Sequence, residues 1–415
     1  MRTGRQTEQP RKSKGRTLRI LLVLILFLIV AIAGAVLYYY NSTLDSLYVS
    51  FTEEAPSVEF GGDYPAMDYV SGSEGIVSPA EDSLEADTLG SEALVYTVSQ
   101  PLFGGLLTPT RDFTLTYTVV DTVDPLILWN GSGTTLQRGT EFNLNDVLGY
   151  GDNADPAPAV TVDGKVDMDT SGSYPLHVTV TDASGNSAEC DLTVIVADSV
   201  PDYPYTSDST PFRKFVSGHK GKGRSFGIDV STWQGDIDFK AVKAAGCDFV
   251  IIRIGYSVDG EVNIDDTYEQ NIERAREAGL RVGIYLFSYD NTIDKVRSSA
   301  RWVVEKLGGS SLDLPVAFDW EDFGRFQEYE MSFTDLNNLY DAFAEELSAG
   351  GYDCMLYGSL NFLEKVWEDT NTRPIWLAHY TDKTDYEGPY MIWQASNTGR
   401  INGIDGDVDM NILYE

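Results

Sequence analysis

Two carboxylates separated by a single residue end the short apolar segment PVAFDWED (315–322). Residues i and i+2 of a strand point to the same face, so Asp319 and Glu321 would project together. Two neighbouring carboxyl groups can supply a proton and a negative charge, which is the combination that general acid–base chemistry uses. A strand that runs out into a solvated acidic loop is the alternative interpretation, and the surrounding elements decide between the two.

The C-terminal segment 226–415 alternates strand-like and helix-like stretches. Its strand-like stretches are FGIDVS (226–231), FVIIRIGY (249–256), RVGIYLFSY (281–289), PVAFDWED (315–322), DCMLYGS (353–359), PIWLAHYT (374–381), MIWQAS (391–396) and DVDMNILY (407–414). Helical stretches separate the first six, which is typical of a parallel βα barrel. The last two gaps, 382–390 and 397–406, are nine and ten residues long. Because a parallel crossover needs about a dozen residues, we expect hairpins there and an irregular TIM-like (β/α)5β3 barrel.

Four acidic residues fall in or at the ends of these predicted strands. Asp229 lies in the first strand, Asp319 and Glu321 end the fourth, and Asp409 lies in the eighth. In βα barrels the catalytic groups come from the C-terminal ends of several strands, so the four are expected to meet. We call the end of the barrel where these four residues would meet the mouth. Carboxylates gathered there in a low-dielectric environment cannot all ionise at ordinary cost, so the pKa of at least one of them is expected to rise.

The segment 226–415 resembles glycoside hydrolase family 25, the lysozymes that cut the glycan of bacterial cell walls. The resemblance rests on GIDVSTWQGDIDF, FVIIRIGY, AGLRVGIYLFS, FDWE, WLAHY, IWQAS and VDMN, in that order. It implies hydrolysis of the β-1,4 bond between N-acetylmuramic acid and N-acetylglucosamine, with matched catalytic positions at Asp229, Asp319, Glu321 and Asp409. Glu321 would be the general acid, and Asp319 would support the sugar's 2-acetamido group as an internal nucleophile. Asp229 and Asp409 would position the sugar, and which aspartate takes which supporting role stays open.

Aromatic and amide side chains in or near the predicted strand ends are candidates for the substrate groove. We expect Tyr285, Tyr357 and Trp393 to face sugar rings, although barrel interiors also use aromatic residues as core. Gln234 and Gln394 are candidates for hydrogen bonds to substrate. The segment DGDVDMN lacks the glycine of a calcium loop, and the histidines and cysteines form no ligand set, so no metal or cofactor is expected.

The N-terminal sequence is typical of a membrane anchor. Residues 1–19 carry seven Lys/Arg and one acid, and residues 20–40 are free of charge and proline. About 20 apolar residues span a bilayer core as a helix, and the basic side stays in the cytoplasm. A cleaved signal peptide is the alternative, but its apolar region is usually about 7–15 residues. We therefore predict an uncleaved transmembrane helix in the cell membrane, with everything after it extracytoplasmic.

Two β-rich regions and a linker are predicted between this anchor and the barrel. Residues 41–123 carry strand-like runs, and residues 124–197 end in a hairpin whose turn is DASGN. The second region resembles the immunoglobulin-like repeats of bacterial surface proteins, so we expect one or two β-sandwich modules that act as a stalk or spacer. Residues 198–225 contain prolines and a basic glycine-rich stretch. They are interpreted as a flexible linker, with contact to an anionic wall polymer as the alternative.

The overall composition narrows the classes of function. The net charge of −34 argues against a nucleic-acid partner, because phosphate binding needs Lys and Arg. Three cysteines in a chain of this length do not form a disulfide scaffold. The sequence therefore predicts a membrane-anchored muramidase whose partner is the glycan of peptidoglycan. The alternative is a non-catalytic wall-binding or adhesion protein that uses the same groove or the β modules.

Overall fold

The computed structural model describes residues 14–200 and 209–415. The chain divides into two compact units, Met1–Thr122 and Val123–Glu415, each described by itself below. Most of the predicted basic tail and the centre of the predicted linker, residues 201–208, lie outside the described residues.

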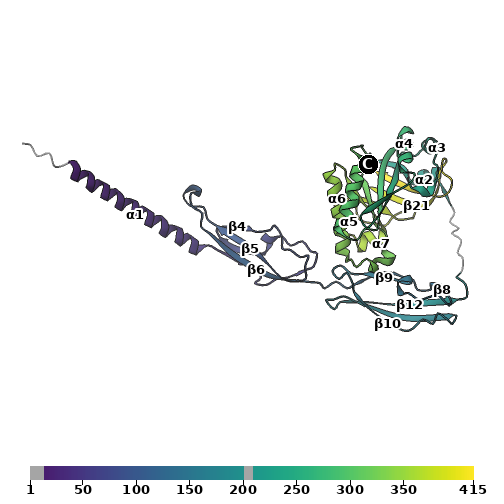
Figure 1. Cartoon of the computed structure of the whole chain (residues 1–415), viewed down its shortest axis with the longest axis horizontal. Coiled ribbons are helices and arrows are strands. Elements are labelled where there is room, and N and C mark those ends of the chain that lie inside the picture. The colour runs from purple at the N-terminus through teal and green to yellow at the C-terminus, as the bar shows by residue number, and fades with distance from the viewer. Residues whose placement is uncertain (1–13, 201–208) are drawn as a thin grey trace, which may run out of the picture. The chain divides into compact units, whose positions relative to one another are not determined.

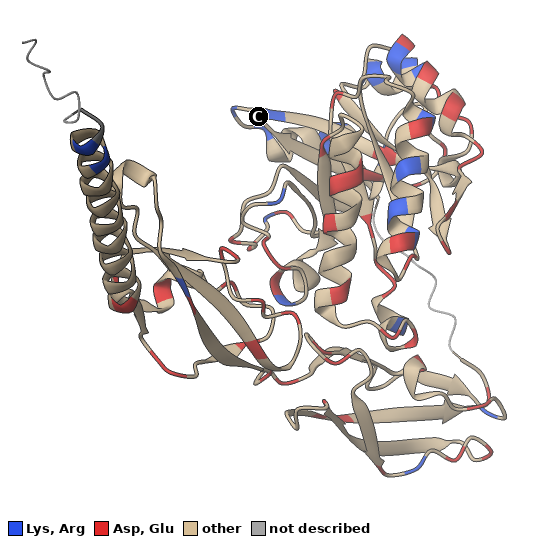
Figure 2. Ribbon diagram, turned by 60° about the vertical axis from the view of Figure 1, so that its left-hand side comes forward, with Lys and Arg blue, Asp and Glu red and all other residues tan. Residues whose placement is uncertain are grey.

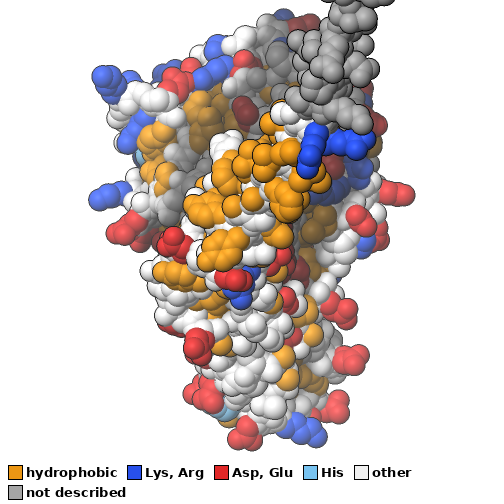
Figure 3. Space-filling model, turned by 90° about the vertical axis from the view of Figure 1, so that its left-hand side faces the viewer, with side chains coloured by type: hydrophobic (Ala, Val, Ile, Leu, Met, Phe, Trp, Pro, Cys, Tyr) orange, Lys and Arg blue, Asp and Glu red, His pale blue; other side chains and the backbone are white. Residues whose placement is uncertain are grey.

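The first unit begins with a long apolar helix, α1 (Lys14–Ser46). It exceeds the predicted 20–40 because polar residues continue it, and the hydroxyl of Thr43 donates to the Tyr39 carbonyl at 2.9 Å. Between its N-terminal arginines and its last turn the helix carries no charge (Figure 2). Its apolar side chains face the surroundings (Figure 3). By length and composition, residues Arg16–Ser46 could cross a membrane.

Strands follow α1 in this unit (Figure 1). Their bounds are β1 (Tyr48–Phe51), β2 (Ser57–Glu59), β3 (Val70–Glu74), β4 (Ile76–Pro79), β5 (Gly90–Ser99) and β6 (Thr110–Val120). One sheet has the order β2-β6-β5-β4, and β1 pairs with β3. Alternate residues of β5 and β6 point inward, so Tyr96 and Leu115 are fully buried. The Tyr96 hydroxyl donates to the Ala66 carbonyl at 2.7 Å, which satisfies its polar end.

The second unit begins with a small β module. Its strands are β7 (Leu126–Asn130), β8 (Thr135–Gln137), β9 (Leu148–Gly151), β10 (Ala159–Asp163), β11 (Gly172–Thr181) and β12 (Ser187–Ala197). One sheet has the order β10-β11-β12-β8, and β7 pairs with β9. The predicted hairpin is β11–β12, and its turn is held by Asp182, whose carboxylate accepts from the amides of Gly185 at 2.6 Å and Asn186 at 2.8 Å.

Eight strands of the second unit close into a ring. Their bounds are β14 (Arg224–Val230), β15 (Phe249–Val258), β17 (Arg281–Ser288), β18 (Val316–Asp319), β19 (Cys354–Ser359), β20 (Ile375–Ala378), β21 (Ile392–Arg400) and β22 (Val408–Tyr414). Strands β14 to β21 pair in parallel in this order, and β22 is antiparallel to both β21 and β14. Two short strands, β13 (Thr210–Pro211) and β16 (Glu261–Ile264), extend the sheet.

Five helices connect the strands from β14 to β20 (Figure 1). They are α3 (Phe239–Ala244), α4 (Tyr268–Glu277), α5 (Ile293–Leu307), α6 (Phe333–Ala349) and α7 (Leu360–Lys365). Successive strand residues point to opposite faces, so the apolar core has two parts. Phe249 and Ile251 belong to one cluster with Trp376, whereas Val250 and Ile252 belong to the cluster that includes helix residues.

The connection between β20 and β21 differs from the prediction. A hairpin was expected, but the two strands are parallel, with Trp376 opposite Ile392. The reason is that β20 ends at Ala378 rather than at residue 381, which leaves residues 379–391 for the connection. That length is enough for a parallel crossover without a helix. Strands β21 and β22 are antiparallel, as expected.

Part of the predicted linker is folded. Helix α2 (Phe212–His219) packs on the barrel, with Phe212 and Phe215 buried in its main apolar cluster. Residues three apart lie on one face of a helix, so these two rings form a single anchoring surface. This helix corrects the interpretation of the whole segment 198–225 as a flexible tether.

Candidate active site

Asp229 lies where the ring of strands closes. In register it is opposite Ile251 on one side and Asp409 on the other, so its side chain shares the inner face with them. One carboxylate oxygen accepts from Nε2 of Gln394 at 2.9 Å and from Nδ2 of Asn411 at 2.7 Å. Burial raises the pKa of Asp229, and these hydrogen bonds oppose that rise. Asp229 is thereby favoured as the ionised member of the group.

Asp319 is the last residue of β18 and lies between Phe287 and Tyr357 of the neighbouring strands. Its side chain is buried, and its Oδ1 has no hydrogen-bond partner among the described residues. Burial, followed by the charges of Glu321 and Asp229, holds its pKa well above the ordinary value. A buried carboxyl group without a partner for one oxygen is costly unless it serves a ligand or keeps a proton.

Glu321 follows two residues later and is the exposed member of the group. Desolvation in the crowded mouth, followed by the charge of Asp229, raises its pKa to about 7. Because Glu321 as a whole is an exposed residue, a substrate could approach it from the solvent side. A carboxyl group with this pKa exchanges its proton near neutral pH, which is the property of a general acid and base.

Asp409 completes the group from β22, the antiparallel neighbour of β14. Burial, the charge of Asp229 and a hydrogen bond to that residue raise the pKa of Asp409 to about 9. Each of two such carboxyl groups disfavours ionisation of the other, so the pair holds one proton at neutral pH. The structure thus brings together all four predicted carboxyl groups, since a charge on one raises the pKa of others.

Hydrogen-bonded side chains connect the predicted aromatic residues to this group. The hydroxyls of Tyr357 and Tyr380 donate to Oε1 of Gln394 at 2.8 and 3.1 Å, and Gln394 in turn donates to Asp229. The ring of Tyr285 packs edge-on against Trp376 at 5.9 Å. Burial, then the charges of Asp229 and other carboxylates, holds the pKa of Tyr285 well above its ordinary value, so it is a neutral hydroxyl donor.

Two predicted groove residues have other surroundings. Trp393 is 4% exposed, its Nε1 donates to the His379 carbonyl at 2.8 Å, and its ring packs on His219 of α2 at 5.5 Å. This position beneath α2 corrects the expectation that Trp393 faces a sugar. Gln234 accepts from the Ser231 amide at 2.9 Å and caps the short turn after β14, so it shapes the loop rather than reaching the carboxylates.

Other polar residues of the mouth were not singled out from the sequence. The guanidinium of Arg253 pairs with the buried Asp265 at 2.9 Å and opposes the rise in the pKa of Asp319. A single cation inside the apolar strand FVIIRIGY was the available signal for it. Asn411 lies two residues after Asp409, on the same face of β22, and that spacing could have identified it.

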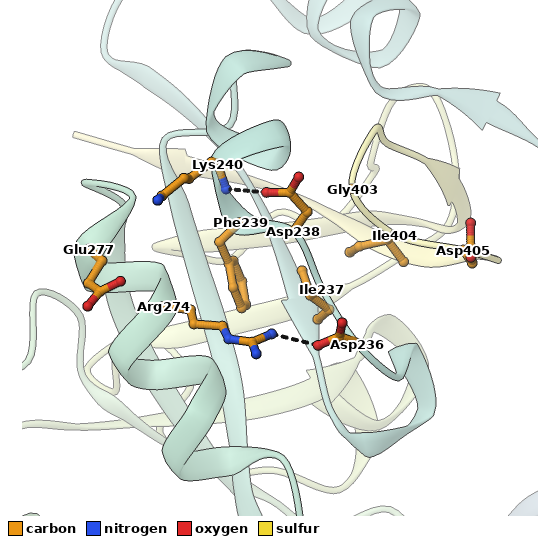
Figure 4. A pocket seen from close by; sticks show the side chains of 10 residues that line it. All are labelled: Asp236, Ile237, Asp238, Phe239, Lys240, Arg274, Glu277, Gly403, Ile404 and Asp405. Atoms are coloured by element: carbon orange, nitrogen blue, oxygen red, sulfur yellow. Dashed lines mark hydrogen bonds and ion pairs between the residues drawn. The ribbon is translucent and has the colours of Figure 1, made fainter.

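Further hollows and acidic pairs lie elsewhere in the second unit. One hollow has a volume of about 500 Å³; Arg274 pairs there with Asp236 at 2.6 Å, and Asp238 caps α3. Figure 4 shows the side chains that line it. None of the four mouth carboxylates lines it. In the β module, carboxylate oxygens of Asp152 and Asp182 lie within 4.8 Å, which is a spacing that a cation could bridge.

Comparison with known proteins matches two segments of the second unit to known families. Residues 228–404 match the model for glycosyl hydrolases family 25, and residues 128–196 match that for the bacterial surface protein Ig-like domain. The chain is 30% identical to the autolytic lysozyme of Clostridium acetobutylicum over 191 residues, 46% of this chain and 56% of that protein. It is 31% identical to lysozyme M1 of Streptomyces globisporus over 198 residues, 45% of this chain and 66% of that protein.

The chain therefore spans just over half the length of the first of these relatives. The solved bacterial lysozyme from Streptomyces coelicolor shares 27% identity, with 46% of this chain and 92% of that chain covered and a TM-score of 0.39. The predicted resemblance is confirmed by the family models: residues 228–404 belong to glycosyl hydrolase family 25, and an Ig-like domain of the bacterial surface type precedes them.

Proposed function

We propose that the chain is a membrane-anchored muramidase that hydrolyses the β-1,4 bond between N-acetylmuramic acid and N-acetylglucosamine in peptidoglycan. The main supporting observation is that Glu321, an exposed residue next to the buried Asp319, has a carboxyl group whose pKa is raised to about 7 by desolvation and by the charge of Asp229. Such a group is about half protonated at neutral pH, so it can donate a proton and later accept one. The names of the matched lysozymes support the same substrate.

The proposed reaction has two steps. Glu321 gives its proton to the glycosidic oxygen while the bond from that oxygen to the anomeric carbon breaks, and the acetamido oxygen of the same sugar bonds to that carbon. Asp319 in its ionised form accepts a hydrogen bond from the acetamido nitrogen as that nitrogen becomes positive, and the developing positive charge favours this ionised form over the protonated one. Water then attacks the anomeric carbon, gives one proton to Glu321 and releases the acetamido group. Two displacements on one carbon leave its configuration unchanged.

Exposed aromatic rings near the mouth support binding of a sugar chain. Trp233 follows Asp229 by four residues and is 82% exposed, and Tyr380 is 52% exposed. Large aromatic faces in water are favourable surfaces for the apolar faces of sugar rings. Tyr380 and Asn397 also line part of a hollow of about 930 Å³. We place the glycan strand across Trp233, the carboxylates and Tyr380.

The anchor and the β modules are assigned from composition and position. Helix α1 would cross the cell membrane once, with Arg16 and Arg19 on the cytoplasmic side and the remaining chain outside. The region 41–123 would act as a spacer. Protease added to intact cells should remove the catalytic segment but not the N-terminal end, and protection of the catalytic segment would contradict the orientation.

A non-catalytic wall-binding protein is the second candidate, because the groove alone could hold a glycan. Purified peptidoglycan incubated with the full chain in detergent separates the two. Release of reducing sugar supports the muramidase. Binding to peptidoglycan without release of reducing sugar would favour the second candidate and contradict the catalytic roles of Asp319 and Glu321.

A further inference from the structure

The Ig-like domain contacts the segment that follows the catalytic strand β18. Strands β7 and β9 pack against the short helix η5 (Phe323–Glu328), which begins two residues after Glu321. At Gly149 an added Cβ atom would lie 3.2 Å from the Phe323 carbonyl oxygen. At Gly151 it would lie 2.7 Å from the Phe333 ring and 2.8 Å from the Phe326 ring. A side chain at residue 151 would therefore displace these rings, whereas a side chain at residue 149 would meet mainly Trp129 of the same domain.

Backbone groups of the domain also complete the start of helix α6. The first amides of a helix have no partner within it. The amide of Phe333 donates to the Asp152 carbonyl at 2.7 Å, and that of Thr334 donates to the Asn153 carbonyl at 3.3 Å. Two helix-terminal donors of the barrel are thereby satisfied by the β module, which a flexible spacer would not do.

Apolar side chains of the Ig-like domain belong to the same apolar cluster as those of η5. Leu128 of β7 is 6% exposed and belongs to the barrel's main apolar cluster, and Trp129 packs against that cluster. The same cluster contains Trp320, which is fully buried between Asp319 and Glu321. The Trp320 ring lies 5.1 Å from Phe323 and 5.8 Å from Phe326, the rings that the domain covers.

The backbone links these contacts to the catalytic acid. The Phe323 amide donates to the Glu321 carbonyl at 2.7 Å, and Nε1 of Trp320 donates to the Asp290 carbonyl at 3.2 Å. Glu321 is therefore held between a buried indole on one side and η5 on the other. Movement of η5 away from its support would move the Glu321 carboxyl group and admit water around it.

We propose that strand β9 of the Ig-like domain positions the general acid Glu321 by supporting η5 and the start of α6. The domain is then part of the catalytic unit rather than only a stalk. The inference rests on the proposed function, because it concerns the group that donates the proton. Gly149 and Gly151 are positioning residues that act through Phe323, Phe326 and Phe333.

The test is Gly151→Val in the full chain, compared with Gly172→Val. Gly172 lies in β11 of the same domain, and a Cβ atom there would meet only ordinary contacts at 3.5 Å. We expect Gly151→Val to lower kcat for peptidoglycan about tenfold or more, since small displacements of catalytic groups are costly, with KM within about twofold. Gly172→Val should keep both constants close to wild type.

The pH profile separates positioning from lost stability. Better hydration of Glu321 lowers its pKa, so the alkaline limb of kcat should move to lower pH in Gly151→Val. Partial unfolding would reduce the amount of active enzyme without moving that limb. Adding Phe333→Leu makes room at residue 151 and should partly restore kcat and the limb.

The proposal is supported if the alkaline limb of kcat moves to lower pH in Gly151→Val and if adding Phe333→Leu partly restores both kcat and the limb. An unchanged kcat, or a lower kcat with an unmoved limb, overturns it while leaving the muramidase assignment intact. If Gly151→Val does not fold, Asn145→Ala, which removes a hydrogen bond of 3.3 Å to Glu328 of η5, is measured for the same limb. Absence of hydrolysis by the wild-type chain would contradict the proposed function instead.

Discussion

Replacement of Glu321 by glutamine tests the assignment of the general acid. The amide keeps the size and hydrogen-bonding capacity of the protonated carboxyl group but cannot release a proton. With a pKa of about 7, about half of the wild-type molecules carry the proton at pH 7 and about nine-tenths at pH 6. General acid catalysis contributes about 10²–10⁴-fold, so we expect kcat to fall by that factor while KM changes by less than about threefold.

The assay is release of reducing ends from purified peptidoglycan between pH 5 and 9. For the wild-type enzyme, kcat should fall as the pH rises through about 7, because Glu321 loses the proton that it must donate. This alkaline limb should disappear in Glu321→Gln. The matched control is Glu277→Gln, which removes a carboxylate lining the hollow of Figure 4 and should leave kcat unchanged. Full activity of Glu321→Gln, or loss of activity in Glu277→Gln, would refute the assignment.

Other variants probe the remaining residues of the mouth. Asp319→Asn should lower kcat by about 10²-fold or more with KM little changed, because the developing positive charge loses its partner; a change confined to KM would contradict this role. Trp233→Ala should raise KM for glycan fragments several-fold through loss of a stacking surface, measured by initial rates, and an unchanged KM would exclude it from the groove. Asp409→Asn should raise Tm relative to wild type by an amount that grows as the pH rises from about 4 to about 9. Wild-type Asp409 has a folded pKa of about 9, above its unfolded value, so ionisation favours unfolding over that range; a constant difference in Tm would contradict it.

The carboxylates could be identified from the sequence because they sit at the ends of regularly spaced apolar strands. Asp229 and Asp409 are far apart in the chain, yet the ring places them opposite each other in register. The family 25 resemblance was confirmed over residues 228–404, which include Asp229, Asp319 and Glu321 but not Asp409. The antiparallel closure by β22 makes the convergence possible, since it brings the last strand beside the first.

The features that the sequence did not predict depend on tertiary packing. Trp393 lies in a predicted strand, but whether its ring faces a groove depends on α2, whose apolar anchors lie within a segment rich in glycine and charge. The parallel pairing of β20 and β21 depends on where β20 ends, and a difference of three residues changes the expected connection. The partnership between Arg253 and Asp265 depends on a loop contact that periodicity does not encode.

The contact between the Ig-like domain and η5 could likewise not be predicted from the sequence. Gly149 and Gly151 resemble ordinary glycines of an edge strand in the sequence GYGDN. The importance of Gly151 comes from the rings of Phe326 and Phe333, more than 170 residues away, and Gly149 lies near the Phe323 carbonyl oxygen of the same segment. Interpretation of the domain as a stalk was therefore the natural expectation from composition alone.

Mass spectrometry of the products released from purified peptidoglycan by the full chain in detergent tests the central claim most directly. The four carboxylates of the mouth are predicted to cleave after N-acetylmuramic acid, so every new reducing end should be that sugar. Fragments ending in N-acetylglucosamine, or glycan that stays intact while bound, would contradict the account.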